Sequence, residues 1–273
     1  MGLRVNTNIA SLTAQRHMTV ITRRLGDNYA RLASGLRIAT AADDAAGLAI
    51  SERMRSQIRS YAVAGRNAQD GISLVQTAEG ALGEVSNILS RMRELAMQSA
   101  NGTLDTVDRQ TLDTEFQALD QEIDRIATST EFNGISLLDG SSTGIPIQVG
   151  LDSGDTISVS GGDTQSAVLG IDTLALLDIT QAETALEALD SAIGTINTSR
   201  GNLGASQNRM TSALSSILSA RENLSAAESR IRDVDVASET ADLTRNNIMQ
   251  QASVSVLQQA NVQPQIALSL LQG

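Results

Sequence analysis

Between residues 182 and 231, every seventh position of the chain is apolar. The eight positions hold Ala182, Leu189, Ile196, Leu203, Met210, Ile217, Leu224 and Ile231. A heptad repeat of this length is typical of a long helix that packs along one side against other helices. The companion seam is interrupted by Arg200, Gln207, Arg221 and Glu228, as expected for a bundle with mixed partners. At 1.5 Å per residue this helix would be about 75 Å long, which favours a structural rod over an enzyme core.

The composition excludes most kinds of catalytic site. The chain has 273 residues, 1% aromatic residues, no Cys, no Trp and one His, His17. Without Cys it cannot form a disulfide, a thiolate zinc site or an iron–sulfur cluster, and one His cannot build a multi-histidine metal site. We therefore predict no catalytic, cofactor-binding or metal-binding residues, no cofactor, and a mainly α fold: a long antiparallel helical bundle or coiled coil.

Other segments repeat the helical pattern. Apolar residues at helical spacing cover about residues 5–36, 72–95 and 104–128, and a last stretch begins near Val236. Ser34-Gly35 and Asn101-Gly102 interrupt the pattern, and Asp43 and Asp44 are suited to capping the second helix. Pro264 lies within the last stretch and is expected to kink or interrupt it.

The middle of the chain has a different period. Ile145, Ile147 and Val149 alternate with other residues, as do Ile157 and Val159 beyond a turn signal at 152–155. This alternation predicts a β-hairpin near residues 145–160. Because residues 141–166 are rich in Ser, Thr, Gly and Asp, we expect them to form an exposed surface segment.

The first and last helices are expected to pair. Each carries an apolar stripe that it cannot bury alone, and a lone amphipathic helix is marginal in water. Pairing covers part of each stripe and leaves the rest for other copies of the chain, so we expect termini that become ordered on assembly. The residues assigned to these polymerisation stripes are Val5, Ile9, Leu12, Leu25, Leu32, Ile248, Val254, Leu257, Leu268 and Leu271.

Charge and hydropathy limit the partners. A net charge of −11 argues against nucleic acid. No run of 18 apolar residues occurs, so we expect no membrane span. The opening MGLRVNTNIASLTAQRH lacks the apolar core of a signal peptide, so we expect secretion, if it occurs, without a cleaved leader.

A set of motifs in order along the chain resembles bacterial flagellin, the subunit of the flagellar filament. In the N-terminal half they are NTNIASL at 6–12, LASGLRI at 32–38, AADDAAGLAIS at 41–51, RNAQDGISLVQTAEGAL at 66–82, RMRELAMQSANGT at 91–103 and FNGISLLDG at 132–140. In the C-terminal half they are GASQNRM at 204–210, SRIRDVD at 229–235, IMQQASVSVLQQAN at 248–261 and PQIALSLL at 264–271.

The resemblance implies a fold and a role. Residues 1–40 and 237–273 would pair as an inner coiled-coil domain, and residues 41–236 would form a rod-like helical domain with a minimal variable segment. The chain would be a structural subunit, not an enzyme, that polymerises into the extracellular filament for motility. Implied partners are other copies of the chain, the flagellar cap and hook-junction proteins, an export chaperone and the type III export apparatus.

The resemblance also implies a patch for a vertebrate Toll-like receptor, carried here by Arg91, Leu95 and Glu115. The same residues could instead serve subunit packing.

Two alternatives to a filament subunit remain at this stage. A hook–filament junction protein has similar terminal helices, although RMRELAMQSANGT and PQIALSLL are more similar to filament flagellin. An enzyme with paired carboxylates would draw on Asp105, Asp108, Asp113, Glu115, Asp120, Glu122 and Asp124, but these are spaced as a solvated helix face.

Overall fold

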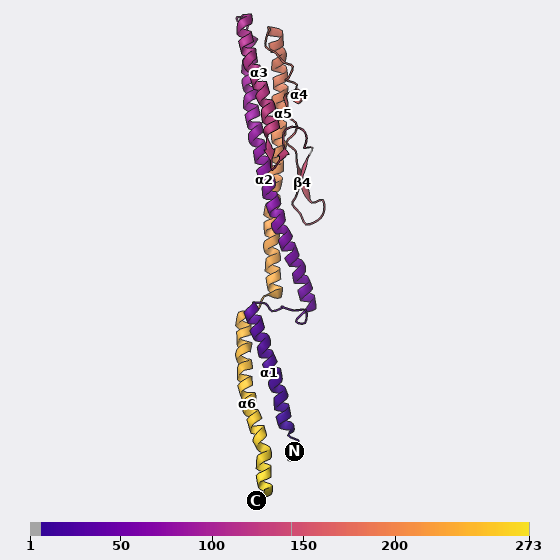
Figure 1. Cartoon of the computed structure of the whole chain (residues 1–273), viewed down its shortest axis with the longest axis vertical. Coiled ribbons are helices and arrows are strands. Elements are labelled where there is room, and N and C mark those ends of the chain that lie inside the picture. The colour runs from indigo at the N-terminus through magenta and orange to yellow at the C-terminus, as the bar shows by residue number, and fades with distance from the viewer. Residues whose placement is uncertain (1–6, 143, 273) are drawn as a thin grey trace. The chain divides into compact units, whose positions relative to one another are not determined.

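The computed structural model describes residues 7–142 and 144–272, and the side chains up to residue 263 (Figure 1). Its helices are α1 (Ile9–Ser34), α2 (Ala45–Ser99), α3 (Thr106–Ser129), α4 (Ser166–Leu169), α5 (Ile179–Arg232) and α6 (Val236–Gln272). Its strands are β1 (Glu131–Phe132), β2 (Ile135–Ser136), β3 (Ile145–Gln148) and β4 (Thr156–Val159). The predicted fold class, long packed helices with a small hairpin region, is confirmed. Among the described residues, no helix is both long and apolar enough to cross a bilayer.

The chain divides into two compact units, which we describe separately. The first comprises Met1–Ser56 with Asn223–Gly273, and the second comprises Gln57–Glu222. Both divisions fall inside long helices, α2 and α5. The sequence predicts different domain boundaries, after residue 40 and before residue 237, which follow the breaks between helices. Those boundaries stay a prediction.

Local chemistry sets the ends of the helices. The Asn8 side chain accepts a hydrogen bond from the Ser11 amide at the start of α1, and Gly35, at φ 71°, ends that helix in the left-handed conformation. Asp44 caps α2 by accepting from the Gly47 amide at 2.9 Å. Asp43 closes the preceding loop instead, and its hydrogen bonds from the amide and hydroxyl of Thr40 lower the pKa of its carboxyl.

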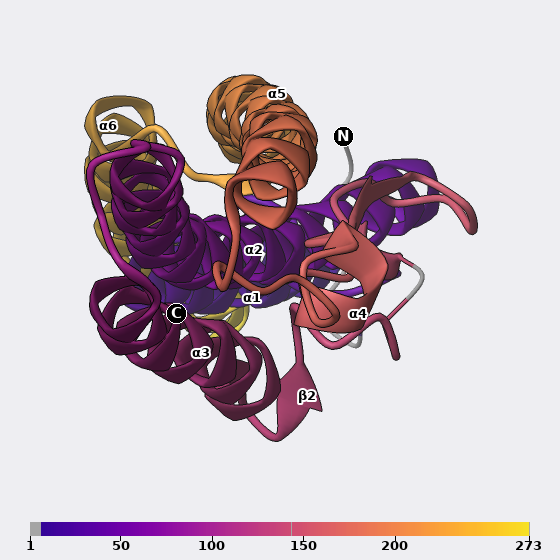
Figure 2. The ribbon, with the colours of Figure 1, turned by 90° about the horizontal axis from the view of Figure 1, so that it is seen from above.

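The core of the second unit lies along the heptad seam of α5. The seam residues from Ala182 to Met210 are fully buried, and Ile217 is 4% exposed. They pack with apolar residues of α2 and α3, including Leu82, Leu89 and Phe116. Figure 2, viewed along the helices, shows α2, α3 and α5 beside one another with the small strands at one side. The predicted packing of this helix in a bundle is confirmed.

The predicted hairpin is present, and it is partly buried. β3 pairs antiparallel with β4, with Ile145 opposite Val159 and Ile147 opposite Ile157. Ile157 and Val159 are buried in the core of the second unit, and the Asn67 amide of α2 donates to the Gln148 carbonyl at 3.1 Å. The expectation of an exposed segment over 141–166 is therefore wrong for this face, because alternate strand residues pack against the helices.

Helix α6 continues through Pro264 to Gln272. The predicted interruption at Pro264 is wrong, and the alternative, a kink there, stays a prediction. A proline inside a helix removes one amide donor and crowds the preceding turn, and here this does not end the helix.

Candidate functional site

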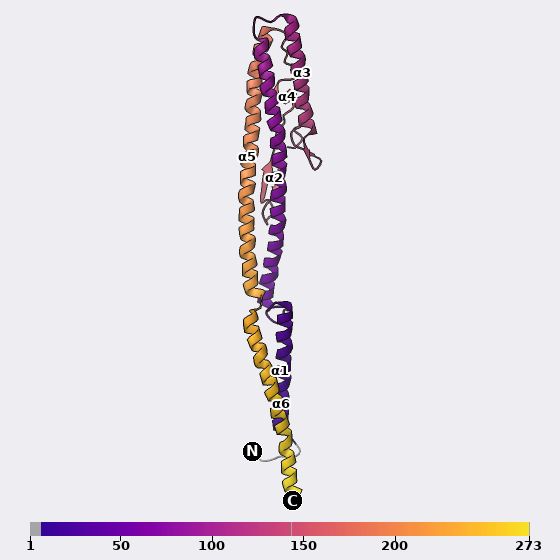
Figure 3. The ribbon, with the colours of Figure 1, turned by 90° about the vertical axis from the view of Figure 1, so that its left-hand side faces the viewer.

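In the first unit, α1 packs against α6 along a heptad seam (Figures 1 and 3). The helices are antiparallel: Asn8 bonds to Ala260, whereas Asn28 bonds to Asn246. Residues three and four apart are buried or half-buried on both helices. On α1 they are Ser11, Ala14, Met18, Ile21, Leu25, Asn28 and Leu32; on α6 they are Glu239, Leu243, Asn246, Gln250, Ser253, Leu257 and Ala260.

The side of α6 that faces α1 is thus mostly polar or small, and most of its larger apolar residues lie elsewhere. Several exposed apolar side chains of this unit lie near the start of α1 or on α6. We call them the open apolar residues. They are Ile9 (61% exposed), Leu12 (58%), Val236 (59%), Ile248 (61%), Met249 (40%), Val254 (39%), Val256 (59%) and Val262 (42%). Exposed apolar side chains of this kind are candidates for contact with another molecule.

The structure divides the residues predicted as polymerisation stripes into two sets. Leu25 is buried, and Leu32 and Leu257 are half-buried, in the α1–α6 seam. Ile9, Leu12, Ile248 and Val254 are exposed. The side chains of Val5, Leu268 and Leu271 lie outside the described residues. The two sets have different contacts: the first holds α1 to α6, and the second is free to meet other chains.

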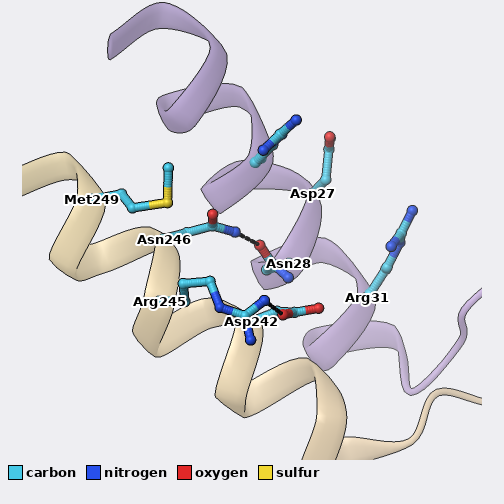
Figure 4. A pocket seen from close by; sticks show the side chains of 8 residues that line it. Asp27, Asn28, Arg31, Asp242, Arg245, Asn246 and Met249 are labelled. Atoms are coloured by element: carbon cyan, nitrogen blue, oxygen red, sulfur yellow. Dashed lines mark hydrogen bonds and ion pairs between the residues drawn. The ribbon is translucent and has the colours of Figure 1, made fainter. Parts of the chain in front are cut away.

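A cluster of buried polar side chains, which we call the polar layer, crosses the seam, and Figure 4 draws two of its members, Asn28 and Asn246. Its members are Asn28, Glu239 and Asn246, exposed by 7%, 9% and 8%. The Asn28 amide donates to Oε1 of Glu239 at 2.5 Å, and the Asn246 amide donates to Oδ1 of Asn28 at 2.8 Å. Hydrogen bonding to the partner helix offsets the cost of burying these groups.

Two surface pockets flank this seam. The first, of about 340 Å³, is lined by the two asparagines with Arg24, Asp27, Arg31, Asp242, Arg245 and Met249. Its rim carries both signs of charge, and Arg245 is paired with Asp242 at 2.6 Å. The second, of about 260 Å³, is lined by Ala14, His17, Met249, Ala252, Ser253 and Val256 and is mainly apolar. It extends the surface of the open apolar residues.

The second unit contains the three residues suggested as a receptor patch. Arg91 on α2 forms an ion pair with Glu115 on α3 at 2.8 Å, and their side chains are 50% and 45% exposed. Hydrogen bonds from Arg91 to Glu115 and to Glu94 raise the pKa of the guanidinium. Leu95 is 1% exposed and belongs to the core. Arg91 and Glu115 are therefore available to a partner, and the side chain of Leu95 is not.

The acidic residues of α3 do not all lie on a solvated face, so that prediction is wrong for three of them. Asp113 accepts a hydrogen bond from the Leu176 amide at 2.8 Å, and Asp124 accepts from the Ser166 amide at 2.7 Å and from its hydroxyl at 2.9 Å. These bonds hold the segment 166–176 on α3. Asp120 lies between them in the sequence and is 8% exposed.

Asp120 has an unusual environment. Its Oδ1 atom has no hydrogen-bond partner among the described residues. Burial, with smaller contributions from the negative charges of Asp124 and Asp172, raises the pKa of Asp120 from 3.8 to about 6. The described residues contain no group of three His, Cys, Asp or Glu side chains arranged to hold a metal ion. Sequence spacing could not reveal this burial, because the segment that covers Asp120 lies some fifty residues further along the chain.

Comparison with known proteins identifies the family. The model of the bacterial flagellin N-terminal helical region matches residues 5–143, and that of the C-terminal helical region matches residues 186–271. The chain belongs to the bacterial flagellin family.

Relatives and a solved structure agree with this membership. The chain is 47% identical to the flagellin of Halalkalibacterium halodurans over 269 residues, covering 98% of this chain and 99% of the relative. It is 45% identical to the flagellin of Bacillus subtilis over 303 residues, covering 98% and 100%. The crystal structure of Bacillus cereus flagellin matches with a TM-score of 0.51 and 43% identity, covering 60% of this chain and 94% of that one.

Family membership establishes the role of the chain. It is a structural subunit of the bacterial flagellar filament, which is extracellular, and flagellins are structural proteins rather than enzymes. The comparisons do not favour a hook–filament junction protein. The residues predicted as polymerisation stripes lie within the two matched regions.

Proposed function

We propose that flagellin subunits of this kind join in the filament through the open apolar residues of α1 and α6. The observation that carries the proposal is their distribution around α6. At about 100° per residue, Val254 and Val256 point about 200° apart, yet both are exposed, as is Ile248. A helix with apolar residues on several sides is stable in water only when it is enclosed by neighbours.

This distribution favours a polymer over a dimer. One partner placed against one side of α6 would leave Val254 or Val256 in water. Several neighbours around each α6 would cover all sides, which is the arrangement of a repeated, non-closing interface in a helical assembly. Fully burying one such aliphatic side chain contributes about 2 kcal/mol, and several per subunit would drive assembly.

Seeded polymerisation tests this proposal. Filaments are dissociated, and the purified chain is extended from short seeds and observed by electron microscopy. Ile248→Ser and Val256→Ser should each raise the critical concentration by about tenfold or more, since loss of 1.4 kcal/mol changes an equilibrium constant tenfold. Gln251→Ser and Gln258→Ser, at exposed polar positions of the same helix, are the matched controls and should polymerise normally. Normal critical concentrations for both apolar variants would contradict the proposal.

We further propose that the chain meets the flagellar cap and hook-junction proteins, an export chaperone and the type III export apparatus. Membership of the flagellin family supports these partners. Export is tested by comparing the amount of the chain in the medium of cells with an active and an inactivated flagellar type III apparatus. Equal amounts in the two media would contradict the export route.

We also propose that Arg91 and Glu115 contribute to a surface bound by a vertebrate Toll-like receptor. Their exposure on adjacent helices supports the proposal, and the burial of Leu95 assigns that residue to the core. Arg91→Asp should reduce receptor signalling by the soluble subunit, with Arg125→Asp on the exposed surface of α3 as the control. Unchanged signalling would remove Arg91 from the site.

A further inference from the structure

The side of α6 that packs against α1 is mostly polar or small, and larger apolar residues also lie on the other sides of this helix. Asn246, Gln250 and Ser253 face α1, whereas Ile248 and Val256 point to solvent. Because apolar residues lie on several sides of α6, apolar burial against Ile21 and Leu25 of α1 does not by itself select one of these sides. Some other interaction must therefore determine which side of α6 meets α1.

We infer that the polar layer, Asn28 with Glu239 and Asn246, determines the rotation of α6 about its own axis. Both hydrogen bonds of the layer join side chains on different helices, at 2.5 and 2.8 Å. If α6 turned so that Ile248 faced α1, Asn28 would keep its buried position and lose both partners. A buried polar group without a partner is costly, and a single buried polar contact is known to select one helix arrangement over others.

The other hydrogen bonds between α1 and α6 among the described residues do less to fix the rotation of α6. Asn8 donates to the backbone carbonyl of Ala260 at 2.8 Å, and backbone carbonyls occur at every residue and on all sides of a helix. Ser11 donates to the side chain of Asn261 at 2.8 Å, but Asn261 is exposed, so water can replace this bond. Among the described side chains of α1 and α6, only those of the polar layer combine burial of both partners with a hydrogen bond between the two helices.

The inference rests on the proposed function and adds a positioning role to it. By satisfying Asn28, the layer keeps Ile248 and Val256 pointing away from α1, where neighbouring subunits can bury them. The polar residues of the seam therefore leave Ile248 and Val256 exposed on the unpolymerised subunit, so that they can be buried against neighbouring subunits in the polymer.

Engineered disulfides can report the rotation of α6 about its own axis, because the chain has no native Cys that would compete. Met18 lies in the seam between the Asn28–Asn246 and Ser11–Asn261 contacts, which places it near the level of Ser253 and Ser255. Met18→Cys is combined with either Ser253→Cys, on the side facing α1, or Ser255→Cys, on an exposed side. The two serines lie about 200° apart around the helix, and the Ser-to-Cys change is the same in both. Intrachain disulfide formation is measured on dilute, unpolymerised subunits by non-reducing electrophoresis.

With the native polar layer, the yield of the 18–253 disulfide should be at least ten times the yield of the 18–255 disulfide. The ratio of these two yields reports the rotation of α6. Asn28→Leu leaves Glu239 and Asn246 without partners and should shift this ratio toward 18–255 by tenfold or more. Glu239→Gln retains the acceptor and should keep the native ratio. The triple change of Asn28, Glu239 and Asn246 to Leu makes the same side apolar and should restore the preference for 18–253.

An unchanged ratio of the two disulfides in Asn28→Leu would overturn the inference, and so would an equal loss of both disulfides, which would mean that the layer only stabilises the helix pair. Equal yields at the two positions in the native background would overturn it as well. Because the disulfides are read on unpolymerised subunits, their outcome is independent of the Ile248→Ser and Val256→Ser polymerisation test. The two proposals can therefore fail separately.

Discussion

Neutralising Asp120 should stabilise the second unit above pH 6. Burial raises the pKa of this carboxyl from 3.8 to about 6, so the folded chain holds the proton more tightly than the unfolded chain does. The stability associated with the protonated form is fully present below about pH 4 and is lost as the pH rises through about 6. At 1.36 kcal/mol per pKa unit, the loss is on the order of 3 kcal/mol at pH 8.

Asp120→Asn has nearly the same shape and cannot ionise. We expect it to be more stable than the native chain at pH 8 by up to about 3 kcal/mol, with the difference shrinking as the pH falls toward 5. The measurement is urea denaturation of the unpolymerised chain, followed by circular dichroism at several pH values between 5 and 8.

Asp124→Asn, one helical turn away, is the matched control. Asp124 accepts two hydrogen bonds from Ser166, and replacing its carboxylate with an amide should weaken them and lower the stability at pH 8. The reasoning about Asp120 would be refuted if Asp120→Asn were no more stable than the native chain at pH 8, or if its stability changed with pH in parallel with the native chain's.

Three further changes test the packing and capping of the second unit, each by urea denaturation. Leu203→Ala removes a fully buried residue of the α5 seam and should cost about 2–5 kcal/mol; a loss below 1 kcal/mol would contradict its place in the core. Asp105→Ala removes the side chain that accepts from the Val107 and Asp108 amides at the start of α3 and should cost about 0.5–2 kcal/mol; an unchanged midpoint would show that this cap is dispensable. Gly161→Ala should destabilise the chain, because a Cβ at this position would overlap the carbonyl oxygen of Leu137, and a neutral result would show that the two segments can move apart.

Much of the helical architecture follows from the sequence because it depends on local periodicity. The heptad from Ala182 to Ile231 predicts the long α5 helix and its buried side, since the 3.6-residue turn places every seventh residue on one face. Gly35 and Asp44 mark helix ends through backbone conformation and capping, which also act over a few residues. The alternation around Ile145 and Ile157 predicts the hairpin for the same reason.

Other features depend on which segments meet in the folded chain. The burial of Asp120 requires the segment 166–176 to lie against α3, and periodicity along α3 carries no information about that segment. The same limit applies to Ile157 and Val159, whose strand is Ser- and Thr-rich in sequence but has one face against the helices.

For the terminal helices, the sequence by itself determines that both are amphipathic and that each needs a partner, because the spacing of apolar residues along a helix is local. Only the tertiary structure decides that Leu25, Leu32 and Leu257 lie in the α1–α6 seam while Ile9, Leu12, Ile248 and Val254 stay exposed. The physical reason is that α6 carries apolar residues on several sides, so hydropathy cannot select one of them. Hydrogen bonding of Asn28 across the helix pair is a long-range contact, and it exists only once the chain has folded.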